Sequence, residues 1–256
     1  MKKFLSIALA MLLMLCLVAC SGNEDVADDD FEDLEGEDVV VNDSPFEFEA
    51  TEINTWEIVG YNGGFDRHEV VIPAEHEGIE ITRIAPKAFY YNNSITKVTI
   101  PNTVTEIGDW AFAGCSYLSE VVIPDSVTKI GAGAFYLCDD IKSIKLSEAL
   151  VELDNYAFYE CVALTSIDIP ATVTTVGDGA FWGCTALTAV SGNEGVKDLG
   201  AYSFKGCTAL ASITLTADVA EIGEYAFEEC EALTVKAPAG SYAETYLTAY
   251  GYAYAN

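Results

Sequence analysis

The apolar and polar positions of this chain repeat with a fixed period, and the same residue types recur at every twenty-third position. One aromatic position marks every repeat. From the second repeat onward a cysteine follows it by three positions, and an Ile or Leu follows it by six in all repeats. The aromatic column consists of Phe89, Phe112, Phe135, Phe158, Phe181, Phe204 and Phe227. Such a period predicts a repeat architecture, in which each unit buries its apolar positions only by stacking on its neighbours.

Each unit contains one predicted strand followed by a turn. In "LTSIDIPATVTTVGDGAFWGC", residues 164–184, Ile167 and Ile169 share one strand face because they lie two positions apart. Pro170 ends the strand, since proline has no N–H to donate. A glycine column comes next and indicates a backbone position that needs positive φ or close approach. Asp154 fills it in the fourth unit, and Asp tolerates positive φ. The glycines are Gly108, Gly131, Gly177, Gly200 and Gly223.

Stacked units of this kind predict an α/β-type, β-rich repeat solenoid with one parallel sheet. Seven coils at about 4.8 Å per strand give a sheet about 30 to 35 Å long. The units resemble BspA-type bacterial leucine-rich repeats, whose pattern is Ile-Pro-x-x-Val-x-x-Ile-Gly-x-x-Ala-Phe-x-Gly-Cys-x-x-Leu, and the resemblance covers about residues 70–236. In the sixth coil Gly192 stands where an inward Ile belongs. We therefore expect the weakest joint of the solenoid there.

Both ends of a solenoid need a cap, because each would otherwise expose an apolar cross-section. Residues 55–73 alternate apolar and polar positions around Asn62-Gly63-Gly64, which predicts a capping β-hairpin. At the other end Ser241 is a predicted N-cap, and Gly251 is the predicted stop of a short helix. That helix places three tyrosines on one face: Tyr242, Tyr246 and Tyr250.

The N-terminus has the features of a secretory signal. Lys2 and Lys3 precede an apolar run over 4–18, which is shorter than the roughly 20 residues of a transmembrane helix. The following Leu17-Val18-Ala19-Cys20 resembles a bacterial lipobox. The resemblance implies cleavage before Cys20 and attachment of diacylglycerol to its sulfur, so that Cys20 becomes a lipidated N-terminus. The alternative is an ordinary signal peptide that is cut nearby, with Cys20 incidental.

An acidic segment follows Cys20. Between Ser21 and Asp43 there are eleven Asp or Glu residues, which favours a solvated tether extended by self-repulsion. The acidic residues do not follow the alternating spacing of an EF-hand, so we expect no calcium site. The predicted parts of the chain are a lipoprotein signal peptide (1–19), the lipidated Cys with a disordered tether (20–43), an N-terminal capping hairpin (44–73), the solenoid (74–236) and a C-terminal cap (237–256).

Net charge narrows the choice of partners. The formal charge is −29 at pH 7, and a polyanion of this kind repels phosphate backbones. We therefore expect no nucleic-acid partner. The remaining partners are the membrane, through the N-terminal lipid, and an extracellular protein or glycan.

The cysteines and histidines give little support for metal binding or catalysis. Cysteines that recur once per repeat form a line rather than a tetrahedron, and parallel in-register thiols have poor geometry for disulfides. An inward ladder of small apolar thiols is the favoured interpretation. His68 and His76 belong to no catalytic motif, and no phosphate loop is present. We therefore expect no enzyme activity, no metal and no cofactor.

The residue after each Phe supplies the candidate binding site. Since the Phe points inward, its neighbour is expected to point outward, which places Tyr136, Tyr159 and Trp182 in one row. The row could stack on sugars or contact a protein, and lateral packing over the turns is the alternative. The BspA resemblance implies adhesion at the cell surface. The runner-up function is a structural envelope protein without a specific ligand, and a carbohydrate-active enzyme is a distant third.

Overall fold

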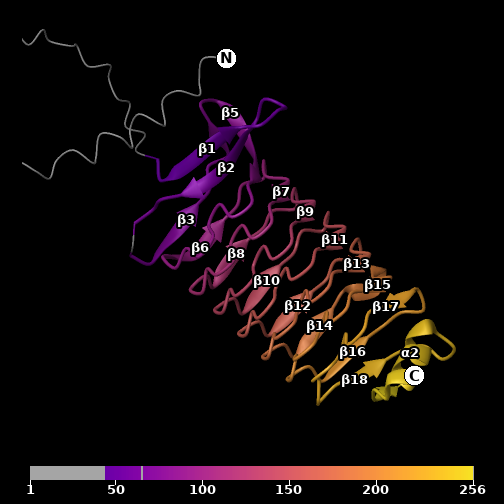
Figure 1. Cartoon of the computed structure of the whole chain (residues 1–256). Coiled ribbons are helices and arrows are strands. Elements are labelled where there is room, and N and C mark those ends of the chain that lie inside the picture. The colour runs from indigo at the N-terminus through magenta and orange to yellow at the C-terminus, as the bar shows by residue number, and fades with distance from the viewer. Residues whose placement is uncertain (1–43, 65, 256) are drawn as a thin grey trace, which may run out of the picture. The chain divides into compact units, whose positions relative to one another are not determined.

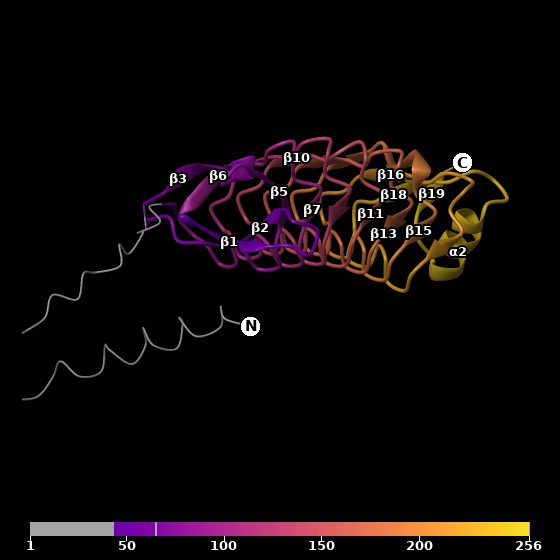
Figure 2. The same cartoon turned by 90° about the horizontal axis from the view of Figure 1, so that it is seen from above.

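The computed structural model describes residues 44–64 and 66–255, which wind into one elongated solenoid (Figure 1). The coils follow one another along a single axis, and their strands form two walls with the interior between them (Figure 2). The predicted signal peptide, Cys20 and the acidic tether lie outside the described residues. The predicted class, a parallel β-solenoid with repeats of about 23 residues and little helix, is confirmed.

The first sheet has ten strands in the described part of the chain. Their order is β1-β2-β5-β7-β9-β11-β13-β15-β17, and β4 pairs with β5. The β1–β2 and β4–β5 pairs are antiparallel, whereas the strands from β2 onward run parallel along this order. The bounds are β1 Phe46–Ala50, β2 Trp56–Tyr61, β4 Glu75–His76, β5 Ile79–Ile84, β7 Glu106–Ile107, β9 Lys129–Ile130, β11 Glu152–Leu153, β13 Thr175–Val176, β15 Asp198–Leu199 and β17 Glu221–Ile222.

The second sheet has nine strands in the described residues, in the order β3-β6-β8-β10-β12-β14-β16-β18-β19. Its register follows the sequence period, so that Ile144 of β10 lies beside Ile167 of β12. The bounds are β3 His68–Val71, β6 Ile95–Thr99, β8 Glu120–Val122, β10 Ser143–Lys145, β12 Ser166–Asp168, β14 Ala189–Ser191, β16 Ser212–Thr214, β18 Thr234–Lys236 and β19 Tyr254–Ala255.

The presence of two sheets corrects the expectation of one. The sequence pattern predicts a strand only before each proline and a turn after it. In the structure the residues after the proline form a second strand of two residues, such as Thr175–Val176. Two residues are too few to show the alternation of apolar and polar positions that marks a strand. The sequence signal for this sheet was therefore just one column of apolar residues, one per repeat.

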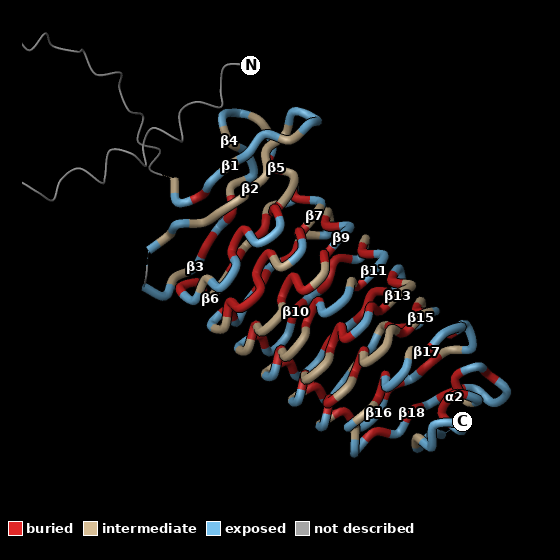
Figure 3. The backbone as a smooth tube through the Cα atoms, viewed as in Figure 1, coloured by how far each residue is buried: buried red, intermediate tan, exposed pale blue. Residues whose placement is uncertain are grey.

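Side chains from both walls fill the interior. Buried and exposed segments alternate along each coil (Figure 3), as expected when every second strand residue points inward. The Phe column forms a continuous stack inside one edge of the solenoid. Neighbouring rings lie 4.8 to 5.9 Å apart between centroids, with interplanar angles of 3 to 15°. We call this stack, Phe89 to Phe227, the phenylalanine ladder.

The cysteines line the interior beside the phenylalanine ladder, as predicted. Each thiol donates a hydrogen bond to the carbonyl oxygen of the ladder Phe in the preceding coil. The Sγ of Cys184 and the oxygen of Phe158, for example, are 3.1 Å apart. Five of the six thiols are buried, and Cys230 in the last repeat is half-buried. Because a thiol is a weak donor and a small apolar group, it satisfies a carbonyl of the turn without a charged or large side chain.

The glycine column was predicted to need positive φ or close approach, and the structure shows close approach. None of these glycines has positive φ. A Cβ on Gly177 would lie 2.6 Å from the backbone nitrogen of Asn155 in the preceding coil. Asp154 likewise lacks positive φ, so tolerance of that conformation does not explain its place in the column. Positive φ instead occurs two residues before and two residues after every Phe of the ladder, for example at Tyr156 and Glu160.

The N-terminal cap is a hairpin, but its strands differ from those predicted. Strand β1 pairs antiparallel with β2, and their connection runs through 51–55 rather than through Asn62-Gly63-Gly64. The two strands that flank Asn62-Gly63-Gly64 lie in different sheets, since β2 pairs with β5 and β3 pairs with β6. This arrangement buries Ile58 and Val70 against opposite walls of the first coil, which an antiparallel pair of β2 and β3 would not do.

The C-terminal cap is the predicted helix, α2 (Tyr242–Tyr250). The Ser241 hydroxyl accepts a hydrogen bond from the Glu244 N–H, and Gly251 ends the helix with a φ of 73°. Tyr246 is buried, and its hydroxyl donates to the carbonyl of Gly223 at 2.9 Å, so the helix is attached to the last coil. The other two tyrosines of the predicted face, Tyr242 and Tyr250, are exposed.

The sixth coil compensates for its missing Ile with a polar contact. A short 3-10 helix, Asn193–Gly195, replaces the usual turn. The buried side chain of Asn193 donates to the carbonyl of Thr214 in the next coil at 2.7 Å. That this joint is the weakest of the solenoid stays a prediction.

Candidate functional site

Aromatic side chains form a continuous row on the outside of the turns that carry the phenylalanine ladder. Between neighbouring rings the centroid distances are 4.6 to 5.4 Å, and each coil from the second to the seventh supplies one ring. Tyr225 is 43% exposed, and the other five are half-buried. We call this set the aromatic row: Trp110, Tyr136, Tyr159, Trp182, Tyr202 and Tyr225.

The predicted residues Tyr136, Tyr159 and Trp182 form the middle of the aromatic row. Tyr136 stacks on Tyr159 with ring centroids 4.6 Å apart and an interplanar angle of 6°. Trp182 meets Tyr159 edge-on at 5.4 Å. The structure therefore brings all three together. Their role in binding remains a prediction.

Sequence reasoning missed the three outer members of the row. Trp110, Tyr202 and Tyr225 stand two residues before a Phe of the ladder rather than one residue after it. Every residue of that column has positive φ, which turns its side chain toward the same outer edge. The signal in the sequence was the column itself, because it holds either an aromatic residue or glycine in six of its seven positions: Lys87, Trp110, Gly133, Tyr156, Gly179, Tyr202 and Tyr225.

The glycines of this column make room for the rings of the preceding coil. A Cβ on Gly133 would lie 2.7 Å from the indole of Trp110, and a Cβ on Gly179 would lie 2.7 Å from the ring of Tyr156. In those two coils the ring comes instead from the residue after the Phe. The row therefore draws on two columns: Trp110, Tyr202 and Tyr225 come from the column before the Phe, and Tyr136, Tyr159 and Trp182 from the column after it.

Polar groups hold the C-terminal half of the row. The Lys205 ammonium lies 5.1 Å from the ring centroid of Trp182 and 5.6 Å from that of Tyr202, within the range of cation–π attraction. The same ammonium is 2.6 Å from a carboxylate oxygen of Glu228. Burial, together with the neighbouring Glu160, raises the pKa of Tyr159 to about 12. Its hydroxyl therefore remains protonated at neutral pH and is able to donate.

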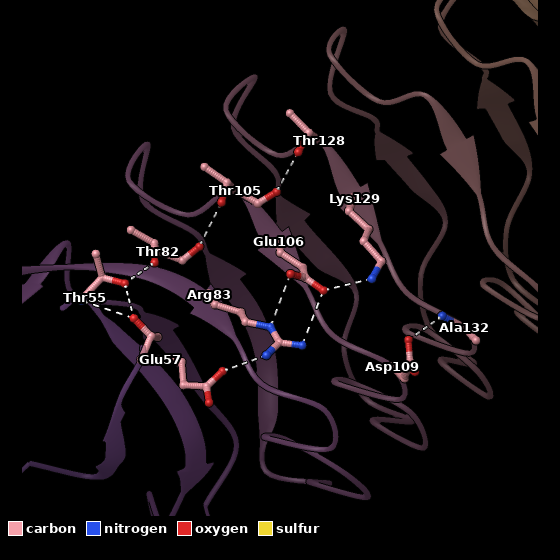
Figure 4. Close-up of polar contacts among 11 residues, drawn as sticks. Thr55, Glu57, Thr82, Arg83, Thr105, Glu106, Asp109, Thr128, Lys129 and Ala132 are labelled. Carbon is pink, nitrogen blue, oxygen red and sulfur yellow. Dashed lines mark hydrogen bonds and ion pairs between the residues drawn. The ribbon is translucent and has the colours of Figure 1, made fainter. Parts of the chain in front are cut away.

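The outer face of the first sheet is charged rather than aromatic. Figure 4 shows Arg83 between Glu57 and Glu106, with nitrogen to oxygen distances of 3.2 and 3.3 Å, and Lys129 on the other side of Glu106 at 3.0 Å. Beside them, the hydroxyl of Thr105 donates to the carbonyl of the threonine one coil earlier. Partly exposed pairs of this kind contribute at most about 1 kcal/mol each. They fix side chains between coils and offer no anchor for a ligand.

Further along the same face the charges are no longer balanced. A shallow groove of about 340 Å³ is lined by Glu152, Asp178, Asp198 and Glu221, and no basic residue lines it. In the part of the chain that the structure describes, no group of three or more His, Cys, Asp or Glu side chains is arranged to hold a metal ion. We assign no ligand to this groove.

The two histidines are part of the N-terminal cap. His76 stacks on Phe48 with ring centroids 3.9 Å apart and lies edge-on to Trp56. His68 forms a hydrogen bond with the hydroxyl of Tyr61 at 2.6 Å. Both rings thus have structural contacts. A membrane-spanning helix, long and apolar enough to cross a bilayer, is absent from the described residues.

Comparisons with known proteins agree with this architecture. The family described as the BspA type leucine rich repeat region matches residues 82–190 and 151–237 in six copies, more than half of the chain. A leucine-rich cell surface protein from Faecalibacterium prausnitzii is 36% identical, with a TM-score of 0.70 over 76% of this chain. The present chain spans 53% of that structure's length.

A leucine-rich repeat protein of T. pallidum is 27% identical, with a TM-score of 0.52, and the match covers 65% of this chain and 88% of that one. Comparison with curated protein sequences gives no match. The family match extends over the same coils that form the aromatic row. The chain therefore belongs to the BspA-type leucine-rich-repeat family.

Proposed function

We propose that the protein is a non-catalytic binding module at the bacterial cell surface, held to the membrane by a lipid on Cys20, and that it adheres to an extracellular protein or glycan. The aromatic row is the observation that carries the proposal. Six rings in unbroken contact form a partly exposed strip along one edge of a rigid solenoid. Tyrosine and tryptophan are also the residues most enriched at the centres of binding sites.

The geometry of the row favours a protein partner. Three of the five neighbouring pairs stack face to face with centroids 4.6 to 5.4 Å apart, and the other two meet tilted or edge-on. The stacked faces are covered, so there the row presents ring edges and tyrosine hydroxyls to the outside. A sugar stacks on an open ring face, whereas a protein side chain can pack against edges and accept hydrogen bonds from hydroxyls. The residue types thus suit either ligand class, and their arrangement suits a protein better.

The proposed anchoring rests on the N-terminal sequence. The lipobox-like Leu17-Val18-Ala19-Cys20 supports a lipid on Cys20, and two or three acyl chains hold a protein at a membrane where one chain would not. The acidic residues 21–43 would then separate the solenoid from the bilayer surface. Replacement of Cys20 by Ser should move the protein from the membrane fraction to the soluble fraction. If the variant stays in the membrane fraction, the proposed anchor is wrong.

A screen for ligands tests the binding role. The purified protein is screened against extracellular-matrix proteins and a glycan array, alongside the triple variant Tyr136→Ala/Tyr159→Ala/Trp182→Ala. We expect at least one saturable interaction that weakens about a hundredfold in the triple variant, because three central anchors are removed. The matched control is Tyr242→Ala/Tyr250→Ala, which removes exposed tyrosines outside the row and should bind normally. Circular dichroism verifies that both variants are folded.

The close packing of the rings also supports a second function. A Cβ on Gly133 would lie 2.7 Å from the indole of Trp110, so the row packs over the turns of the solenoid, which a structural envelope protein would need as much as an adhesin. Absence of any binding at micromolar concentration, with a clear loss of stability in the triple variant, would favour the structural role.

A further inference from the structure

A cleft of about 570 Å³ lies at the N-terminal end of the solenoid, between the turn that follows β2 and the first turn of the phenylalanine ladder. Two segments that are distant in sequence, 61–64 and 91–94, form its walls. Their side chains are aromatic, amide or hydroxyl groups, and glycines complete the lining: Tyr61, Asn62, Gly63, Gly64, Tyr91, Asn92, Asn93 and Ser94. The cleft belongs to the coil before Trp110, the first member of the aromatic row, and shares no residue with the row.

The lining of this cleft carries no formal charge, although the chain has a net charge of −29. The groove on the first sheet provides a contrast, since four carboxylates line it. A cleft without a cation does not bind phosphate or carboxylate strongly, and one without carboxylates gives no attraction to a cation. The ligand class that fits is therefore uncharged.

Intramolecular hydrogen bonds fix the two amides along the first ladder turn. The Oδ1 of Asn92 accepts from the N–H and the hydroxyl of Ser94, at 3.0 and 2.7 Å. The Oδ1 of Asn93 accepts from the N–H of Ser116 at 3.1 Å. These bonds determine which end of each amide is the NH₂ group. Within the described residues neither NH₂ group has a protein partner, so each can donate to a ligand.

The opposite wall supplies acceptors. Asn62 donates its NH₂ group to a carboxylate oxygen of Glu47, which leaves its carbonyl oxygen for a ligand. His68 Nδ1 lies 2.5 Å from the carbonyl oxygen of Asp66, so this nitrogen must be the donor. In the neutral ring Nε2 is then an acceptor, and the Tyr61 hydroxyl donates to it. The Tyr61 oxygen therefore also has lone pairs that can accept a hydrogen bond.

The aromatic surface of the cleft is more exposed than the aromatic row. Tyr91 is 53% exposed, compared with 43% for the most exposed residue of the row. Gly114 makes room for the Tyr91 ring, because a Cβ there would lie 2.6 Å from it, and Tyr90 holds the ring edge-on at 4.6 Å. Tyr61 is held between the ring of Phe89 and the N-terminal hairpin. Both rings thus contact neighbouring side chains before any ligand arrives, which reduces the entropy cost of binding.

We infer that this cleft binds an uncharged saccharide. The C–H face of a sugar ring is apolar and packs on tyrosine, while its hydroxyl groups both donate and accept and so match amide donors on one wall and carbonyl or phenol acceptors on the other. The inference deepens the proposed function by naming a ligand class and a second site. It rests on the proposal that the protein binds molecules outside the cell.

The test uses an array of uncharged oligosaccharides built from hexoses, N-acetylhexosamines and deoxyhexoses, followed by calorimetric titration of the best binder. Tyr91→Ala should weaken this binding at least tenfold, whereas Tyr91→Phe, which keeps the ring, should change it less than threefold. Asn93→Asp is the matched polar variant, because it keeps an acceptor for the Ser116 N–H and removes the NH₂ donor. It should also weaken binding at least tenfold.

The controls separate this site from the aromatic row. The variant Tyr136→Ala/Tyr159→Ala/Trp182→Ala should bind the saccharide normally. If the saccharide is lost only in that variant, the cleft is not the site, although the row would still bind a ligand. Binding of peptides instead of saccharides, or no saccharide binding at millimolar concentration, would also overturn the inference. Should Tyr91→Ala fail to fold, Tyr91→Phe and Asn93→Asp still decide the question.

Discussion

Two stacks of aromatic rings run side by side along this molecule, one residue or two apart in sequence. Inside, the phenylalanine ladder keeps one residue type in every coil, and its interplanar angles stay between 3 and 15°. Outside, the aromatic row mixes tyrosine with tryptophan, and its angles range from 6 to 64°. Both stacks have nearly the same spacing, because the stacking of coils fixes it. The interior position therefore fixes residue type and ring orientation, whereas the outer position fixes only the spacing.

This difference gives the two stacks separate tasks. Close-packed interiors tolerate little change in volume, so a column repeated without exception is the signature of a shared core site. An outer ring needs only enough contact to be held in place. Either tyrosine or tryptophan therefore fits an outer position, and the choice between them can depend on the ligand. The following predictions test that division.

The largest expected effect is loss of the fold at alkaline pH, which should originate in the interior. Burial raises the pKa of Cys184 to about 12 from its ordinary value of 9.0. Between these values the unfolded chain releases the thiol proton and the folded chain retains it, so rising pH favours unfolding. The contribution is complete below pH 9 and is lost as pH rises to about 12. Burial has the same effect on the pKa of Cys115.

Urea unfolding between pH 7 and pH 11 measures this loss. Cys184→Ala should lower stability at pH 7 and reduce the decline above pH 9, since one titrating thiol is gone. An unchanged slope in this variant would mean that other groups cause the alkaline transition.

The next largest effect should come from removal of one ring of the phenylalanine ladder. Phe158 is fully buried and stacks on Phe135 and Phe181. Phe158→Ala should lower the free energy of unfolding by about 3 to 5 kcal/mol, through lost burial and the cavity that remains. Its outer neighbour is the control: Tyr159→Ala should cost about 1 to 2 kcal/mol, because Tyr159 is only half-buried. Equal losses in urea unfolding would show that the two stacks do not differ in role.

A smaller effect is expected at the glycine column. A Cβ on Gly177 would lie 2.6 Å from the nitrogen of Asn155 and 2.7 Å from the carbonyl carbon of Asp154. Gly177→Ala should therefore cost about 1 to 3 kcal/mol in thermal or urea unfolding, as overpacking does elsewhere. Thr175→Ala in the same coil is the control and should change stability by less than about 0.5 kcal/mol. A neutral Gly177→Ala variant would contradict the close approach of the coils.

The sequence predicted the parts of the fold that depend on shared interior sites. The Phe, Cys and Leu columns fixed the period, the inward thiols and the solenoid, because each coil presents the same site to the same neighbours. The first sheet escaped prediction since its strands in the repeats, such as β13 (Thr175–Val176), are only two residues long. The hairpin was misplaced because alternation around Asn62-Gly63-Gly64 fits both an antiparallel pair and two strands on opposite walls.

The features of the outer surface were predicted less well than the interior, because they do not depend on a site that every coil shares. Half of the aromatic row was found from the column after each Phe. Trp110, Tyr202 and Tyr225 were missed because their column depends on positive φ, which the sequence shows only as frequent glycine. The saccharide cleft had no sequence signal at all. Tyr61 and Tyr91 line one cleft only because the first coils stack on each other.

Thiol labelling of the folded and unfolded protein tests the closed interior most directly. In the folded protein Cys230, the half-buried thiol at the end of the ladder, should react first, and the five buried thiols should react only after unfolding. After unfolding without reductant, all six repeat cysteines should be labelled and identified by mass spectrometry. Rapid labelling of Cys138, Cys161 or Cys184 in the folded protein would contradict the account, as would four or fewer labelled cysteines after unfolding.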